Sequence, residues 1–366
     1  MSALKFLKRV ALGFVAVLFV LAALFALGVV WPEREPQAVR KERPLAIVGV
    51  TVLDLAPTAD ASAAGGGSGN LVTGQTVLIQ GDRISAVGAE GTTAVPQNAA
   101  VVDGRGRYLL PALWDMHAHV YAVSPLLDLP LYIAYGVTNL RDMQGCPQPN
   151  DPFIACAEDK RRWTQEAIAG QRVAPRVVST TSFMANGPGI RKRLKNVPEF
   201  FETSTPDEAR AFVRHFARSV EAIKVYDRIP REAYLALADE AQRVGLPLVG
   251  HRPHAVSAVE AAQHQQSIEH ARFILQEAWP GAAALREVAG MPDWREDRRR
   301  MLDEHDPAMA EEIFAAMKTN GTWYVPTHLT RWADAYADDA RVREDEWLRY
   351  LHPLCAGNGS RMSMRR

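Results

Sequence analysis

Residues 108–119 of this chain read YLLPALWDMHAH, an apolar run that ends in two histidines one residue apart. Such a run is typical of a buried strand. Alternate residues of a strand face the same side, so His117 and His119 are expected to point together, with Asp115 on the same face. In a parallel barrel, functional side chains lie at the carboxyl ends of the strands, which is where these imidazoles fall. The stretch therefore predicts a strand that delivers two histidines to a functional face.

Six similar runs follow, separated by segments with helical patterns. They cover residues 137–142, 176–180, 222–226, 246–251, 266–270 and 322–327. Capping boxes begin helices at Thr205 and Ser257, and Gly245 stands where a helix would end. Strands that alternate with helices predict a parallel sheet, and seven such units indicate an α/β fold of the (β/α)8 TIM-barrel type. A doubly wound open sheet is the alternative, although no G-x-G-x-x-G follows an early strand.

The chain divides by composition into five expected segments. These are a signal or transmembrane segment (1–31), a linker (32–44), a small β-sandwich-like domain (45–106), the barrel (107–354) and an aberrant tail (355–366). Within the small β-domain, the turn signal Gly81-Asp82 predicts a hairpin between residues 75–80 and 83–87. Residues 61–69, nearly all Ala, Gly and Ser, predict a flexible loop.

The first thirty residues have the pattern of an export signal. Lys5, Lys8 and Arg9 precede an uncharged, apolar stretch from Val10 to Trp31. At about 1.5 Å per residue such a helix can span a bilayer core of roughly 30 Å. Basic residues on the amino-terminal flank favour an inner-membrane anchor with the rest of the chain in the periplasm. A cleaved signal peptide, cut near residues 26–28, is the rival interpretation within the same cell-envelope location.

The charge balance bears on partners. Lysine plus arginine equals aspartate plus glutamate, at 42 each, so the formal net charge is zero. No basic excess is present to neutralise phosphates, which argues against nucleic acid as a partner. The expected partners are a small-molecule substrate and, through the N-terminal helix, the membrane.

Three further residues fall at the same expected face as the first histidine pair. His251 and His270 end the fifth and sixth runs, and Lys224 lies inside the fourth, AIKVY. A single histidine on a strand is more often a hydrogen-bonded core residue than a ligand. A charged lysine among apolar residues is costly to bury unless it is paired or chemically altered. The five residues together therefore indicate a site.

These motifs together carry a resemblance to a known family. The stretch YLLPALWDMHAH resembles the opening metal motif of the amidohydrolase superfamily. Gly250-His251 and SIEH at 267–270 resemble its fifth- and sixth-strand ligands. AIKVY resembles the fourth-strand lysine that the imidazolonepropionase-like and prolidase-like branch carboxylates. The resemblance runs from about residue 45 to residue 354, and only the combination of motifs is specific.

The resemblance implies two divalent metal ions. The ligands suit zinc, with manganese and iron as the alternatives. His117 and His119 would hold one ion and His251 and His270 the other, with Lys224 bridging them as a carbamate. A bridging water would then be the nucleophile, and the metals would polarise the scissile carbonyl.

Other candidates rest on position alone. Tyr226 and His254 lie near ligands and are candidate substrate-binding residues, with packing or solvation the equal alternative. Cys146 and Cys156 flank a loop after the second strand, where they either pair in an oxidising compartment or remain two thiols. Four further histidines in polar helical stretches are expected to face solvent: His215, His264, His305 and His352.

The pattern departs from the family at its carboxyl end. The superfamily usually places a catalytic aspartate after an eighth strand, and no such strand is predicted after residue 327, so the catalytic residue is unknown. The tail from residue 355 differs in character from what precedes it. We hypothesise that a frameshift, natural or from sequencing, ended the chain early, which would make it C-terminally truncated.

The expected function is hydrolysis of a C–N bond in an amide, dipeptide or cyclic amide by a metal-activated hydroxide. Prolidase-like dipeptide hydrolysis is the narrower expectation, by analogy to the branch. Two alternatives stay open. One is a truncated, inactive, metal-binding remnant. The other is a mononuclear-metal deaminase, which would need no carboxylated lysine.

Overall fold

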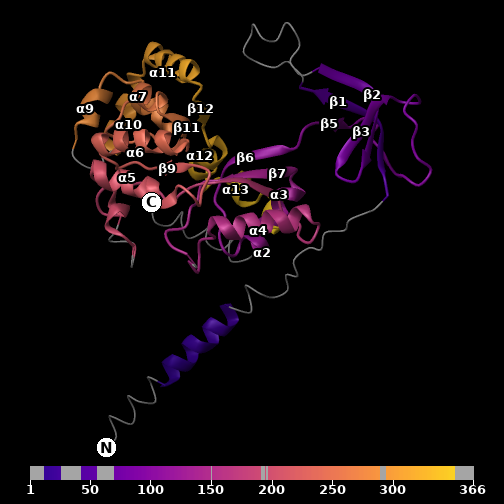
Figure 1. Ribbon diagram of the computed structural model, residues 1–366, viewed down its shortest axis with the longest axis horizontal. Helices are drawn as coiled ribbons and strands as arrows, with labels where there is room; N and C mark the ends of the chain where they lie inside the picture. Colours follow the sequence, from indigo (N-terminus) through magenta and orange to yellow (C-terminus); the bar gives the residue numbers. More distant parts are fainter. Residues whose placement is uncertain are drawn as a thin grey trace, which may run out of the picture. The chain divides into compact units, whose positions relative to one another are not determined.

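The computed structural model describes residues 12–25, 43–55, 70–149, 151–190, 194, 197–288 and 294–350. The chain separates into two compact units (Figure 1). One unit contains residues 37–113, and the other contains residues 1–36 and 114–366. The predicted loop 61–69, most of the linker and the tail 355–366 lie outside the described residues.

The smaller unit is built on one mixed sheet. Its strands are β1 (Leu45–Asp54), β2 (Asn70–Gln80), β3 (Arg83–Ala89), β4 (Ala100–Asp103) and β5 (Tyr108–Leu109). The order is β3-β2-β1-β4, with β5 also pairing with β1. Strands β2 and β3 form the predicted antiparallel hairpin, in which Gln80 pairs with Arg83 across a turn at Gly81, whose φ is +62°.

The prediction of a β-sandwich for this unit was wrong for the part of the chain that is described. Its five strands belong to a single sheet. The side chains of β3 are mostly exposed, with Ile84 and Val87 open to solvent. A second packed sheet would cover one face of such a strand.

The larger unit contains two parallel sheets in chain order. Strands β6 (Leu113–Ala118), β7 (Val137–Asp142) and β8 (Arg176–Thr180) form one, in the order β6-β7-β8. Strands β9 (Ile223–Val225), β10 (Leu248–Gly250), β11 (Gln265–Glu269) and β12 (Trp323–Val325) form the other. Parallel bridges from Thr181 to Ala222 and from Ala185 to Val225 join the end of β8 to β9.

The seven predicted runs of the barrel all contain a strand, and two of them, β7 and β8, have the predicted bounds. The first run divides into β5 and β6, because Pro111 interrupts the backbone hydrogen bonding. The fold is α/β as predicted. Barrel closure is not observed, since no pairing joins β6 to β12 within the described residues.

Helices connect the strands (Figure 1). They are α2 (Ser124–Leu127), α3 (Leu129–Ala134), α4 (Ala157–Ile168), η3 (Glu199–Glu202), α5 (Pro206–Phe216), α6 (Arg231–Val244), α7 (Ala258–Ala262), α8 (Arg272–Glu277), α9 (Ala282–Arg286), α10 (Trp294–Asp303), α11 (Pro307–Asn320), α12 (His328–Ala335), α13 (Ala340–Arg343) and η4 (Glu346–Tyr350). The predicted caps are confirmed. The side chains of Thr205 and Ser257 accept the backbone N–H groups of Glu208 and Glu260, and Gly245 ends α6 in the left-handed region.

The core of the larger unit lies between strands β9 to β11 and helices α5, α6, α7 and α11. Phe201, Phe212, Ile223, Leu237 and Ile268 are fully buried there. Strands β9 and β10 are buried and only three residues long. The residue that follows each strand therefore lies at the edge of the core. Those next residues are the candidates for the site.

Residues 12–25 form a helix whose side chains are exposed. Among the described residues, no helix is both long and apolar enough to cross a membrane, so the predicted transmembrane helix is not supported. The rest of the predicted apolar span, before residue 12 and after residue 25, lies outside the described part.

Candidate metal centre

Side chains from the carboxyl ends of four strands converge on one pocket. The pocket is lined by His117, His119, Lys224, Tyr226, Asp227, His251, His270, Arg272 and Arg331. The first two residues belong to the end of β6, and Lys224 lies in β9. His251 and His270 immediately follow β10 and β11. All five residues expected as metal ligands are thus brought together, although up to 153 positions separate them in sequence.

The two histidines of β6 lie side by side, with ring centroids 5.4 Å apart. The Nδ1 atom of His117 lies 2.9 Å from Oε2 of the buried Glu269. His119 is different, because its Nε2 atom is buried and has no hydrogen-bond partner among the residues that the structure describes. Such an orphaned nitrogen is costly to bury without a partner.

The other two histidines face each other. The Nε2 atoms of His251 and His270 are 3.1 Å apart. Behind these rings, His251 contacts Asp227 through Nδ1, and His270 Nδ1 lies 2.8 Å from Oγ1 of Thr327. Arg272 donates to the second oxygen of Asp227 at 3.0 Å. The carboxylate therefore fixes the His251 ring with Nε2 toward the pocket.

Burial lowers the pKa of three imidazoles of the pocket, those of His119, His251 and His270. Burial, with the charge of Lys224 next in importance, lowers the pKa of His119 to about 3. Burial and the neighbouring His251 lower the pKa of His270 to about 2. Burial also lowers the pKa of His251, against the opposing effect of Asp227. Neutral imidazole is the form that binds a metal ion.

Lys224 is buried, with 3% of its surface exposed. Its Nζ donates a hydrogen bond to the backbone carbonyl of Met143, and its backbone N–H donates to Oγ of Ser182 at 2.9 Å. Burial lowers the pKa of Lys224 to about 8, against the opposing charges of Asp142 and Glu269. The lowered pKa favours the neutral amine that carboxylation requires.

The pocket fits metal ligation in part. Within the described ranges, no group of three or more His, Cys, Asp or Glu side chains is arranged to hold a metal ion as it stands. Two observations nevertheless fit. The buried Nε2 of His119 has no partner among the described residues, as is expected of an atom that ligates a metal ion. In tetrahedral zinc sites with Zn–N distances of about 2.0–2.1 Å, two ligand nitrogens lie about 3.3 Å apart, close to the His251–His270 separation.

Backbone conformation also singles out this pocket. His270 has φ +69° and Thr327 has φ +51°, two of the three non-glycine residues with positive φ in the described chain. Such residues cost energy and cluster at functional sites. Gly250 precedes His251 with φ +125°, and a Cβ there would lie 2.4 Å from the carbonyl oxygen of Val225. Only glycine allows the β9–β10 approach that delivers His251.

The two predicted substrate-binding residues differ in position. Tyr226 lines the pocket and packs on His251, with ring centroids 4.1 Å apart. His254 is buried beside the pocket without lining it, and its backbone N–H donates to the carbonyl of Asp227. Of the histidines expected to face solvent, His215, His264 and His305 are exposed, and His352 lies outside the described part.

Sequence reasoning missed several residues around the pocket. They are Arg141, Asp227, Glu269, Arg272 and Arg331, of which the first three are buried. The signal was available for two of them. Arg141 in LRD and Glu269 in SIEH are charged residues inside strands that otherwise read as buried. Such charges are paired or functional.

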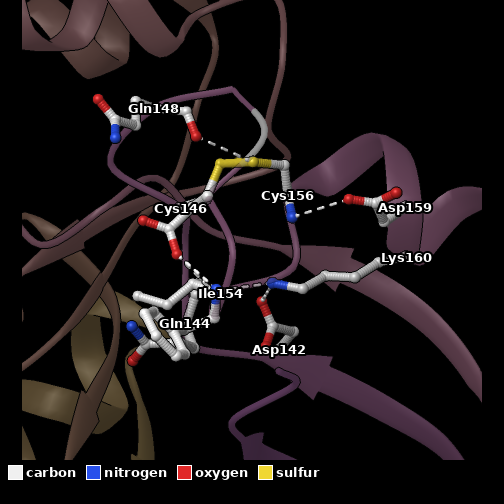
Figure 2. The surroundings of a disulfide bond; sticks show 10 residues. Asp142, Gln144, Cys146, Gln148, Ile154, Cys156, Asp159 and Lys160 are labelled. Carbon is white, nitrogen blue, oxygen red and sulfur yellow. Dashed lines mark hydrogen bonds and ion pairs between the residues drawn. A yellow bond between two sulfur atoms is a disulfide. The ribbon is translucent and has the colours of Figure 1, made fainter. Parts of the chain in front are cut away.

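The cysteine pair is a disulfide, so the alternative of two free thiols was wrong. Cys146 and Cys156 are bonded and close a loop after β7 (Figure 2). Beneath this loop, Lys160 of α4 donates from Nζ to Asp142 and to the carbonyl of Gln144, both at 2.6 Å. Met143, whose carbonyl accepts from Lys224, lies between those two contacts. The stapled loop therefore supports one wall of the pocket.

Comparison with known proteins adds family context. No family model matches the chain. A 53-residue segment, 14% of this chain, is 42% identical to adenine deaminase of Mesorhizobium japonicum and spans 9% of that protein. Among solved structures, molinate hydrolase matches with a TM-score of 0.49 and 16% identity, over 79% of this chain and 73% of that chain. Bottromycin amidohydrolase matches with a TM-score of 0.45 and 21% identity, over 78% of this chain and 66% of that chain.

The chain resembles the amidohydrolase superfamily. The same resemblance was expected from the motifs at residues 108–119, 222–226, 250–251 and 267–270. At these identities the structural similarity concerns the fold. The activity and substrate of this amidohydrolase-like chain are therefore argued from its own residues.

Proposed function

We propose that this chain is a metal-dependent hydrolase that cleaves a C–N bond of a small amide, dipeptide or cyclic amide. The observation that carries the proposal is the convergence of four histidines and one buried lysine on a single pocket. Bound divalent metal would supply a nucleophilic hydroxide at neutral pH and polarise the scissile carbonyl. The remaining chemistry belongs to the residues of the chain.

Two pairs of histidines would hold the ions. His117 and His119 would bind one ion and His251 and His270 the other, with zinc best suited to the imidazole ligands. Lys224 would bridge the ions after carboxylation, in which its neutral amine forms an N–C bond to carbon dioxide and releases a proton. Burial of the amine among apolar strand residues supports this step, because burial favours the neutral form.

The substrate is proposed to carry an anionic group. Two guanidinium groups line the pocket, those of Arg272 and Arg331, together with one carboxylate, Asp227. The side chains of Arg272 and Arg331 are 45% and 48% exposed, so both can reach a ligand. Guanidinium groups match a carboxylate in geometry as well as charge. A free carboxylate next to the scissile amide would satisfy this arrangement, as in a dipeptide.

We also propose that the protein works in an oxidising compartment, exported by its N-terminal segment and either anchored to the inner membrane or released. The support is the Cys146–Cys156 disulfide, since such bonds persist outside the cytosol and are rare within it. Fusion of residues 1–60 to a reporter enzyme that is active only in the periplasm would test this. Absence of reporter activity from a fusion that accumulates in the cell would contradict it.

A second candidate function is supported by the sequence match to adenine deaminase. A mononuclear deaminase would use one metal ion and no carboxylated lysine. The buried position of Lys224 in β9 favours the two-metal hydrolase, because the deaminase would have no use for a lysine there. The two functions differ in metal content and in their dependence on Lys224.

The decisive experiment combines metal content with one variant. The hydrolase predicts about two zinc ions per chain and hydrolysis of members of an N-acyl amino acid and dipeptide panel. Lys224→Ala should abolish turnover and lower the metal content, whereas Lys318→Ala on the exposed end of α11 should change neither. One ion per chain with full deamination by Lys224→Ala would support the deaminase. No metal and no turnover in the wild-type chain would overturn both.

A further inference from the structure

A buried carboxylate on β11 makes contact with two strands of the other sheet. The side chain of Glu269 is fully buried, and the side chains of its partners His117 and Arg141 are 10% and 7% exposed. One oxygen lies 2.9 Å from His117 Nδ1, and the other accepts from Arg141 Nη2 at 2.6 Å. Ser267 donates from Oγ to the second oxygen, also at 2.6 Å. Both carboxylate oxygens of Glu269 thus have hydrogen-bonding partners.

Arg141 fixes the strand that carries the histidine as well. Its Nε donates to the backbone carbonyl of Met116 at 2.7 Å, and Nη1 donates to Ser267 Oγ at 2.8 Å. One side chain therefore joins the backbone next to His117 to the carboxylate that contacts its ring. Within the described residues β6 and β11 are not paired directly. This network of side chains links them.

We propose that Glu269 is a positioning residue that orients His117 for metal binding, an inference that rests on the proposed function. An ionised carboxylate only accepts hydrogen bonds, so this contact makes Nδ1 of His117 the donor. The lone pair of Nε2 is then available for the metal. A carboxylate behind a histidine ligand also raises its basicity, and loss of such a partner costs 10- to 100-fold in metal affinity or activity.

The energetic argument favours a functional role over a structural one. A buried ion pair is weak evidence for stability, because desolvation offsets much of the attraction between the charges. The chain offers a matched comparison in Glu240 of α6, which is 6% exposed and paired with Arg214 and Arg243. Glu240 is also largely buried and paired with arginines, although those arginines are 53% and 62% exposed, and it does not line the pocket. It controls for loss of a buried, arginine-paired carboxylate.

The test compares Glu269→Gln with Glu240→Gln in the full chain. Zinc affinity is measured by competition with a chromophoric chelator, the cobalt-loaded proteins are compared by visible absorption, and the metal-free proteins are melted. We expect Glu269→Gln to lose 10- to 100-fold in zinc affinity and to change the cobalt spectrum. Glu240→Gln should stay within about twofold of wild type in affinity, with an unchanged spectrum.

Other outcomes overturn the inference in distinguishable ways. If Glu269→Gln binds zinc as wild type does, or if both variants weaken equally, Glu269 is structural and the proposed function still stands. If the wild-type chain binds no zinc, the proposed function fails and the inference fails with it. Should Glu269→Gln not fold, Ser267→Ala replaces it, since this variant keeps the charge and removes one hydrogen bond to Glu269. We expect it to lose several-fold in affinity, and unchanged affinity would overturn the inference.

Discussion

The Nε2 atoms of His251 and His270 face each other across 3.1 Å, and a hydrogen-bonding group stands behind each ring. Asp227 contacts Nδ1 of His251, and Thr327 contacts Nδ1 of His270. When the proton of each ring is on Nδ1, the lone pairs of both Nε2 atoms face the same point. The 3.1 Å separation then suits two ligands of one zinc ion.

The support behind His270 is expected to matter for metal binding. Thr327→Val preserves shape and removes the hydroxyl that contacts His270 Nδ1, so we expect a 10-fold or greater loss of zinc affinity by chelator competition. Thr203→Val is the control, because Thr203 also has positive φ and a buried hydroxyl but lies away from the pocket. Equal affinity in both variants would show that Thr327 does not position the ring.

Glycine at position 250 is expected to be required for folding of the pocket. Gly250→Ala places a Cβ 2.4 Å from the Val225 carbonyl at φ +125°, so it should lower the free energy of unfolding by more than about 3 kcal/mol. Gly245→Ala, at φ +76° in open space, should cost only about 1–2 kcal/mol. Urea unfolding of both variants measures the difference, and similar losses would contradict the steric argument.

His254 is expected to make the fold sensitive to acid. Burial and the Arg252 guanidinium lower its pKa to about 4, from about 6.5 in an unfolded chain. Between these values the unfolded chain binds a proton that the folded chain does not, so stability falls as pH decreases, by at most about 3 kcal/mol. His254→Asn should flatten the dependence of the free energy of unfolding on pH from 6.5 to 4. His305→Asn, at an exposed site, should leave the pH dependence unchanged. The prediction would be wrong if the free energy of unfolding changed equally with pH in the wild type and both variants.

Reduction of the disulfide is expected to weaken the loop that follows β7. Cys146 and Cys156 are ten positions apart, and a loop of that size gives a stabilisation of about 2–3 kcal/mol by chain entropy. Chemical denaturation with and without a phosphine reductant should show this loss. The double variant Cys146→Ser, Cys156→Ser should match the reduced protein and no longer respond to the reductant. A response that persists in the double variant would place the effect elsewhere.

The two arginines of the pocket are expected to select anionic substrates. Arg272→Met and Arg331→Met should raise KM for N-acyl amino acids about 10-fold, in line with the loss of one charged hydrogen bond. The corresponding N-acyl amino acid amides, which lack the charge, should show little change in KM. Equal increases in KM for both substrate series would mean that the arginines maintain the structure of the pocket and do not bind the substrate carboxylate.

The sequence by itself determined much of the architecture of the larger unit. Apolar runs between helical segments located its strands, since burial on both faces requires continuous apolar residues. The helix caps at Thr205, Ser257 and Gly245 were also predictable from the sequence. Each cap forms hydrogen bonds with backbone groups only a few positions away. His117, His119, His251, His270 and Lys224 were found because each lies in or directly after a strand, and parallel strands end on one face.

Only the tertiary structure decided what surrounds those residues. The partners Asp227, Thr327 and Glu269 act on rings that lie 24, 57 and 152 positions away. No sequence periodicity encodes such pairings, because they depend on how two sheets approach each other. The disulfide was likewise open in sequence, since spacing allows a bond without requiring it. The tertiary packing determined these partners. A buried charge or imidazole needs a hydrogen-bonding group within about 3 Å, and the fold decides which groups lie that close.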